Sequence, residues 1–124
     1  MEGAPTRIVV VDDSPMYRET ICNMLEKLPN LQVVAEAGDG AYAIQAVKKH
    51  MPDVVLMDIT MPVLNGVEAT RVIRSEFPDV RVIVLSMHDV EAISEAACGA
   101  GACCCLTKGC SPKEIIQAIK TAGI

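Results

Sequence analysis

Short apolar runs alternate along the chain with longer segments of helical period. The runs predict strands over residues 8–11, 32–35, 54–57, 81–85 and 103–106. Three of these, IVVV, VVLM and VIVL, are apolar at every position. A strand covered on one face only would alternate apolar and polar residues, so these strands are expected to be buried on both faces. This pattern is typical of a parallel sheet with helices on both sides.

The segments between the strands carry signals of helix ends. Ser14 followed by Pro15 predicts an N-cap and a first helical residue. SPKE predicts a capping box in which Ser111 and Glu114 bond to each other's backbone. Further helix starts are predicted at Asp39, Asn65 and near Asp89. Residues expected on the buried side of helices include Tyr17, Ile21, Leu25, Ile115, Ile119, Met16, Met24 and Met51. Five strands alternating with five helices predict a (βα)5 doubly wound α/β fold in one domain.

Polar residues stand where four of the strands end. Asp12 and Asp13 follow the first strand, Asp58 the third and Ser86 the fourth, and Lys108 lies just past the fifth. Ligands bind beyond these ends in doubly wound sheets. Each residue alone has an ordinary role, such as a helix cap, a turn residue or a surface lysine. Together they predict an acidic pocket for a hard dication, in which Asp58 attacks phosphorus while the lysine and the hydroxyl contact phosphoryl oxygens.

Composition narrows the function classes. The 124 residues fit one domain, and no apolar run approaches the roughly 20 residues that cross a bilayer. The start of the chain has no signal-peptide pattern, so we expect a cytoplasmic protein. Eleven basic against 16 acidic residues give a net charge of -5, which argues against nucleic-acid binding by this domain.

Six cysteines raise a separate question, because three of them are adjacent. They are Cys22, Cys98, Cys103, Cys104, Cys105 and Cys110. The aliphatic-rich chain does not fit a disulfide scaffold, and the absence of a CxxC pair gives a zinc site little support. We predict reduced packing residues, with Cys103 and Cys105 on one face of the last strand and Cys104 on the other. A redox role for Cys103, Cys104, Cys105 or Cys110 stays open.

Four segments together resemble the receiver domain of two-component response regulators. They are VVVDDSP, DVVLMDITMPVLNGVEA, VIVLSMHD and GACCCLTKG, and the resemblance extends from about Arg7 to Ile119. In its LSMHD segment and in the lack of Pro after Lys108, the chain resembles the subfamily with a C-terminal LuxR-type helix-turn-helix output domain. The resemblance implies a flavodoxin-like five-stranded parallel sheet of order 2-1-3-4-5. It also implies a single receiver domain over residues 1–124, with an ordered core of about 7–120 and no output domain.

The resemblance assigns a role to each residue of the pocket. Asp58 would be the phosphoacceptor, and the metal would be Mg²⁺, with Mn²⁺ as a substitute. Metal contacts would come from Asp13 and Asp58 directly, from the Thr60 backbone carbonyl and from Asp12 through water. Lys108 would contact the phosphoryl group, and the Ser86 hydroxyl would move onto it as the switch.

Three residues are expected to tune the switch. The family usually carries Tyr or Phe where Cys105 stands, and that ring normally rotates when the switch hydroxyl moves. With the small Cys105, we expect coupling through Ser86, its loop and the following helix. Thr60 and His88 would lie beside the path of the hydrolytic water and set the lifetime of the aspartyl phosphate. A solvent-facing loop position for His88 is the alternative.

The resemblance also names partners. The donor would be a sensor histidine kinase, and phosphorylation would change a surface around the fourth helix, fifth strand and fifth helix. That surface would control an output domain or partner. A homodimer that forms on phosphorylation is a further possibility. The end of the chain suits a stand-alone or a truncated receiver, and truncation is favoured. We expect no enzymatic activity other than self-catalysed phosphoryl transfer and autodephosphorylation. The rivals are a scaffold, a flavin-binding protein and an aspartate-nucleophile phosphohydrolase, which would need a second acid two residues after its nucleophile.

Overall fold

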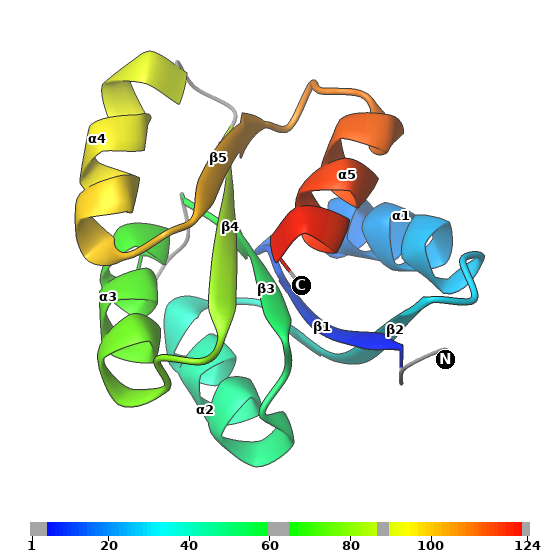
Figure 1. The fold of residues 1–124 in the computed structure, drawn as a ribbon, viewed down its shortest axis with the longest axis horizontal. Helices are drawn as coiled ribbons and strands as arrows, with labels where there is room; N and C mark the ends of the chain where they lie inside the picture. The colour runs from blue at the N-terminus through cyan, green and yellow to red at the C-terminus, as the bar shows by residue number, and fades with distance from the viewer. Residues whose placement is uncertain (1–4, 60–64, 87–89, 123–124) are drawn as a thin grey trace.

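Five parallel strands form one sheet in the computed structural model, which describes residues 5–59, 65–86 and 90–122 and, for 90–94, the backbone alone. The strands are β1 (Thr6–Val11), β2 (Leu31–Ala37), β3 (Val54–Asp58), β4 (Arg81–Ser86) and β5 (Cys104–Thr107). Their order is β2-β1-β3-β4-β5, and every neighbouring pair is parallel (Figure 1). The predicted fold class and strand order are therefore confirmed.

A helix follows each strand. The helices are α1 (Pro15–Glu26), α2 (Gly40–His50), α3 (Gly66–Glu76), α4 (Val90–Ala100) and α5 (Pro112–Ala122). The predicted caps are present: the side chains of Ser14, Asp39 and Asn65 each accept a hydrogen bond from the backbone N–H three residues on. Ser111 and Glu114 form the expected reciprocal bonds. None of the helices in the described ranges is long and apolar enough to cross a membrane.

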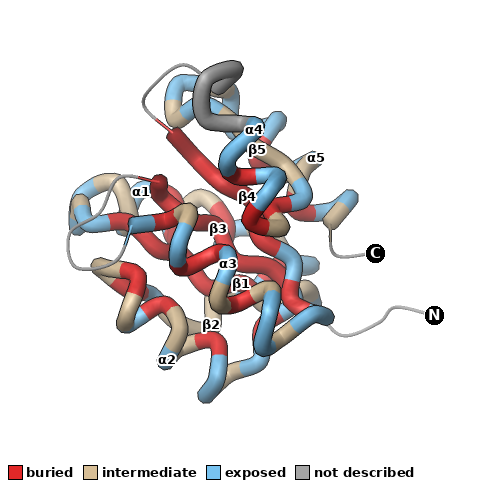
Figure 2. Tube along the Cα trace, turned by 90° about the vertical axis from the view of Figure 1, so that its left-hand side faces the viewer, coloured by how far each residue is buried: buried red, intermediate tan, exposed pale blue. Residues whose placement is uncertain are grey.

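Two apolar cores fill the space on either side of the sheet. Helices α2, α3 and α4 cover one face, and α1 and α5 cover the other (Figure 1). The central strand β3 is buried at all five positions and supplies Val55 and Met57 to the first core and Val54 and Leu56 to the second (Figure 2). Because β3 packs against both cores, Asp58 at its tip is carried by a strand that is covered on both faces.

The predicted burial of two methionines is not observed. Met16 is 78% exposed and Met51 is 50% exposed, so the prediction that they belong to the core is wrong. Met16 is in the first turn of α1, and in the described part of the chain its side chain stays open to solvent. Met51 is the C-cap of α2 in a left-handed conformation (φ 45°), which ends the helical period before its side chain can follow it.

The last strand begins one residue later than predicted. Helix α4 ends at a turn in which the Gly101 N–H bonds to the Cys98 carbonyl and the Ala102 N–H to the Ala97 carbonyl. Gly101 has φ 109°, a conformation that favours glycine. Cys103 then stands exposed before β5, while Cys104 and Cys105 pack against opposite cores as expected.

Candidate functional site

Three carboxylates meet at the carboxyl edge of the sheet. Val11 at the end of β1 pairs with Met57 of β3, so the next residues, Asp12 and Asp58, stand side by side. One oxygen from each of Asp12, Asp13 and Asp58 lies within 4.8 Å of the other two. Asp12 is 2% exposed and Asp58 is 3% exposed, whereas Asp13 is open to solvent. The predicted acidic pocket is therefore present, with one side facing water.

Lys108 reaches the same pocket from the end of β5. Its Nζ lies 2.6 Å from Asp12 Oδ2 and 3.3 Å from Asp58 Oδ1, and its side chain is 9% exposed. The Lys108 N–H donates to the Ser86 carbonyl at 2.9 Å, which ties the loop after β5 to the end of β4. Burial alone would lower the pKa of Lys108, but the hydrogen bond to Asp12 and the charge of Asp58 outweigh it and raise this pKa. Lys108 is therefore a charged partner of the two buried carboxylates.

Among the described residues the charges here do not balance, since three carboxylates lie together and the Lys108 ammonium contacts two of them. Like charges at this spacing repel unless a cation lies between them. The atoms that the three acids offer are carboxylate oxygens, which suit a hard dication that also keeps several water ligands. Across the described ranges, this is the one group of three or more His, Cys, Asp or Glu residues close enough to hold a metal ion. The arrangement can bind a divalent cation beside a buried carboxylate.

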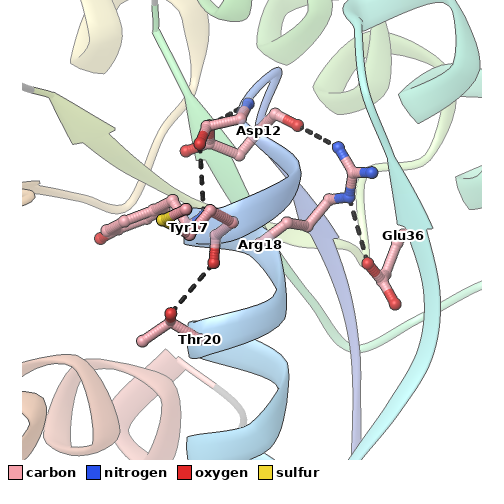
Figure 3. Close-up of polar contacts among 7 residues, drawn as sticks. Asp12, Tyr17, Arg18, Thr20 and Glu36 are labelled. Atoms are coloured by element: carbon pink, nitrogen blue, oxygen red, sulfur yellow. Dashed lines mark hydrogen bonds and ion pairs between the residues drawn. The ribbon is translucent and has the colours of Figure 1, made fainter.

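Asp12 is held in place by contacts that the sequence did not reveal. Its backbone carbonyl accepts a hydrogen bond from the Arg18 guanidinium at 2.6 Å, and Arg18 also pairs with Glu36 of β2 at 3.1 Å (Figure 3). Asp12 Oδ1 accepts from the Ser14 N–H at 2.8 Å, which leaves Oδ2 to Lys108. Arg18 follows Asp12 by six residues, which puts it on the second turn of α1, but its direction could not be read from that spacing.

Asp58 depends on a glycine at the start of α3. A Cβ on Gly66 would lie 2.1 Å from the Asp58 carbonyl oxygen and 2.7 Å from Ile59 Cα. Real side chains do not approach backbone atoms this closely, so only glycine lets α3 begin here. The Gly66 N–H also bonds to the Ile59 carbonyl at 3.0 Å. The Asn65–Gly66 pair was a visible turn signal, although its contact with Asp58 was not.

Tyr17 brings an aromatic ring to the pocket. Lys108 Nζ lies 4.6 Å from the ring centroid. Burial, followed by the negative charge of Asp12, raises the pKa of Tyr17 to about 12, so the phenol stays neutral. The sequence marked Tyr17 only as part of the buried stripe of α1, because helical period identifies a face and not a contact with another loop.

Of the remaining predicted residues, Ser86 and Cys105 are described by the structure, and two others lie outside the described ranges. Ser86 is fully buried at the end of β4, one position past Leu85, which pairs with Asp58. Cys105 is half-buried and packs against the core under α2, α3 and α4. Thr60 and His88 are not among the described residues. The structure thus brings Asp12, Asp13, Asp58 and Lys108 together and places Ser86 on the next strand end.

The group of acids close enough to hold a metal ion includes none of the six cysteines. Burial raises the pKa of the Cys104, Cys105 and Cys110 thiols. A raised pKa disfavours the reactive thiolate. A groove of about 420 Å³ is lined by Arg81, Cys103, Cys104, Ala118, Thr121 and Ala122. It lies where β4 and β5 begin, at the opposite edge of the sheet from the acids.

Comparisons with known proteins agree with this geometry. The model of the response regulator receiver domain matches residues 8–120. The transcriptional regulatory protein DegU of Brevibacillus brevis is 43% identical over 114 residues, which are 92% of this chain and 48% of DegU. A probable transcriptional regulatory protein NarL of Mycobacterium tuberculosis is 39% identical over 91% of this chain and 52% of its own. The chain thus spans about half the length of these relatives.

Solved structures give the same result. The signal receiver domain of the putative response regulator NarL from Mycobacterium tuberculosis superposes with a TM-score of 0.93 at 36% identity, covering 98% of each chain. A two-component response regulator of the LuxR family from Aurantimonas superposes with a TM-score of 0.90 at 39% identity, covering 95% of this chain and 84% of its own.

Proposed function

The chain belongs to the response regulator receiver domain family, and we propose that Asp58 accepts a phosphoryl group from the phosphohistidine of a sensor kinase. In this transfer the bond from phosphorus to the histidine nitrogen breaks, and a bond from phosphorus to an Asp58 oxygen forms. The carrying observation is the buried Asp58 carboxylate, which shares one pocket with two further acids and has Lys108 Nζ at 3.3 Å. An anionic nucleophile approaches a negatively charged phosphoryl group only when cations offset the repulsion, and Lys108 together with a divalent cation held by the acids would supply that positive charge.

Magnesium is the proposed cofactor, with manganese as a substitute. Asp13 and Asp58 would bind it through their carboxylates, Thr60 through its backbone carbonyl and Asp12 through water. When bound, the ion neutralises charge on the phosphoryl oxygens. The all-oxygen donor set and the exposed side of the pocket at Asp13 support this choice.

Lys108 and Ser86 are the proposed phosphoryl contacts. The Lys108 ammonium exchanges its contact with Asp58 for a phosphoryl oxygen and neutralises it. The Ser86 hydroxyl donates a hydrogen bond to another of these oxygens and so draws the end of β4 toward Asp58. Because Cys105 has no ring to rotate, the signal would leave through Ser86, its loop and α4. Thr60 and His88 would set the rate at which the aspartyl phosphate hydrolyses.

The output is proposed to be transcriptional. Relatives that match this chain over about half their length are named as transcriptional regulatory proteins. We propose that residues 1–124 form a single receiver domain, ordered over about 7–120, of a longer cytoplasmic protein with a LuxR-type DNA-binding domain. The surface of α4, β5 and α5 would contact that domain, a partner or a second copy of the chain. A scaffold role is not favoured, because Asp13, Asp58 and Lys108 are all present and assembled.

Intact-mass analysis tests the proposed chemistry. The chain is incubated with Mg²⁺ and acetyl phosphate or with a phosphorylated histidine kinase, and we expect one added phosphoryl group. Asp58→Ala should gain none, while Asp53→Ala, which removes a carboxylate at the opposite edge of the sheet, should gain one as the natural chain does. A chain that gains nothing from either donor, or an Asp58→Ala variant that still gains the group, would contradict the proposal.

A further inference from the structure

Tyr17 connects the first helix to the lysine of the pocket. Lys108 Nζ lies 4.6 Å from the centre of the Tyr17 ring, inside the range of about 6 Å for cation–π attraction. Tyr17 belongs to the first turn of α1, and Lys108 follows β5, so the contact joins the start of a helix to the loop after β5 at the carboxyl edge. The same ammonium contacts Asp12 and Asp58.

Little water reaches this contact. The Lys108 side chain is 9% exposed, and Tyr17 packs against the core beneath α1 and α5. A cation loses most of its hydration in such a place, and its attraction to a ring face is then stronger than on an open surface. Tyr17 is therefore more than a packing residue, because its face balances part of the desolvation of the ammonium.

The three neighbours of the ammonium differ in what can displace them. A metal ion would compete for the Asp12 and Asp58 oxygens, and phosphorylation would occupy Asp58. Neither event removes the Tyr17 ring. We propose that Tyr17 is a positioning residue for Lys108, whose ring face keeps the ammonium at the pocket while its carboxylate partners change. This inference rests on the proposed function of Asp58 and extends it by one residue.

The ring, and not the hydroxyl, carries the proposed role. Within the described part of the chain, the Tyr17 Oη is buried and has no hydrogen-bond partner. A buried hydroxyl without a partner is unfavourable, so removing it should leave the fold as stable or more stable. Phenylalanine keeps the ring face, whereas leucine keeps only apolar volume. The pair Tyr17→Phe and Tyr17→Leu therefore separates the ring from packing.

A double-mutant cycle on the phosphorylation rate tests the role. The natural chain, Tyr17→Leu, Lys108→Met and the double variant are each incubated with Mg²⁺ and acetyl phosphate, and adduct formation is followed by intact mass. We expect Tyr17→Leu to slow the natural chain about tenfold and Tyr17→Phe to change it less than about twofold. In the Lys108→Met background, Tyr17→Leu should have no further effect. Tyr42→Leu is the matched control, because Tyr42 is 62% exposed on α2.

A second measurement does not depend on activity. In protein labelled with ¹³C at lysine Cε, the Lys108 signal should shift in Tyr17→Leu through loss of the ring current. It should shift much less in Tyr17→Phe and stay unchanged in Tyr42→Leu. Thermal melts establish that each variant is folded.

The outcomes separate this inference from the function beneath it. An equal loss from Tyr17→Leu with and without Lys108 would show a packing role and overturn the inference alone. So would a Tyr17→Phe variant as slow as Tyr17→Leu, or an unshifted Lys108 signal in Tyr17→Leu. A natural chain that gains no phosphoryl group from acetyl phosphate or a kinase would overturn the proposed function and this inference with it.

Discussion

The two ends of the sheet use aspartate in opposite ways. Where the strands begin, the Asp53 carboxylate accepts the Arg7 N–H at 2.8 Å, and the Asp53 N–H donates to the Arg7 carbonyl. The Arg7 guanidinium donates in turn to the carbonyls of His50 at 2.7 Å and Met51 at 3.2 Å. These charges are satisfied by backbone groups. We call this the complete end of the sheet, because the charged groups of Asp53 and Arg7 both bond to backbone atoms.

Where the strands end, the carboxylates outnumber their cation. In the described part of the chain, Asp12, Asp13 and Asp58 lie together, and the Lys108 ammonium contacts Asp12 and Asp58, which are almost fully buried. An aspartate whose carboxylate accepts backbone hydrogen bonds has a structural role. An aspartate in a group with excess negative charge is instead available to bind a cation or to react, which is the sense of chemically poised here. Changes at the two ends should therefore respond differently to a divalent cation.

The largest expected effect is at Lys108. Lys108→Met removes the ammonium that both buried carboxylates contact, and breaking such a pair costs about 3 kcal/mol of unfolding free energy. Mg²⁺ should restore much of this loss, because it replaces the missing positive charge. Urea unfolding with a chelator and then with Mg²⁺ measures both values.

The matched control is Lys120→Met, which removes an exposed ammonium from the last turn of α5. It should change the unfolding free energy little under either condition. A Lys108→Met variant as stable as this control in the chelator would mean that the acids repel one another less than their spacing indicates.

The sequence was sufficient for the fold and for the acidic pocket. Apolar runs located the strands, and parallel strands bring their carboxyl ends to one edge, so Asp12, Asp58 and Lys108 were expected at that edge. The strand order that places Asp12 beside Asp58 came from the family resemblance. The burial of β3 between two cores was also predicted, because a strand that is apolar along its length is expected to be covered on both faces. The meeting of Asp12 and Asp58 follows from topology, whereas the reach of Lys108 across the end of β4 depends on its side chain.

Contacts that depend on side-chain direction were not predicted. The Tyr17 ring against Lys108 and the Arg18 guanidinium on the Asp12 carbonyl both depend on the rotation of α1 relative to the sheet. The fit of Gly66 against Asp58 depends on how closely α3 approaches β3. Periodicity identifies the buried face of a helix but gives neither its rotation to within one side chain nor its distance from a strand.

A smaller effect is expected from the cation itself. Mg²⁺ that binds only the folded chain should raise its unfolding free energy by about 2.7 kcal/mol at 100 times its dissociation constant. Asp13→Asn should weaken this binding, since it removes a carboxylate from the open side of the pocket. Asp53→Asn should leave the Mg²⁺ response of the natural chain unchanged. Equal responses in the two variants would mean that the ion binds by general charge and not in the pocket.

The smallest expected effect is at the complete end of the sheet. Asp53→Ala removes an exposed acceptor of the Arg7 N–H, and a bond of this kind contributes at most about 1 kcal/mol. Asp53→Asn keeps a side-chain oxygen that can accept the same N–H, so it should recover most of the loss. Both differences should be the same in chelator and in Mg²⁺, as measured by urea unfolding. If the loss in Asp53→Ala grows when Mg²⁺ is added, the two ends of the sheet are coupled through β3, and the division between a structural and a chemically poised end does not hold.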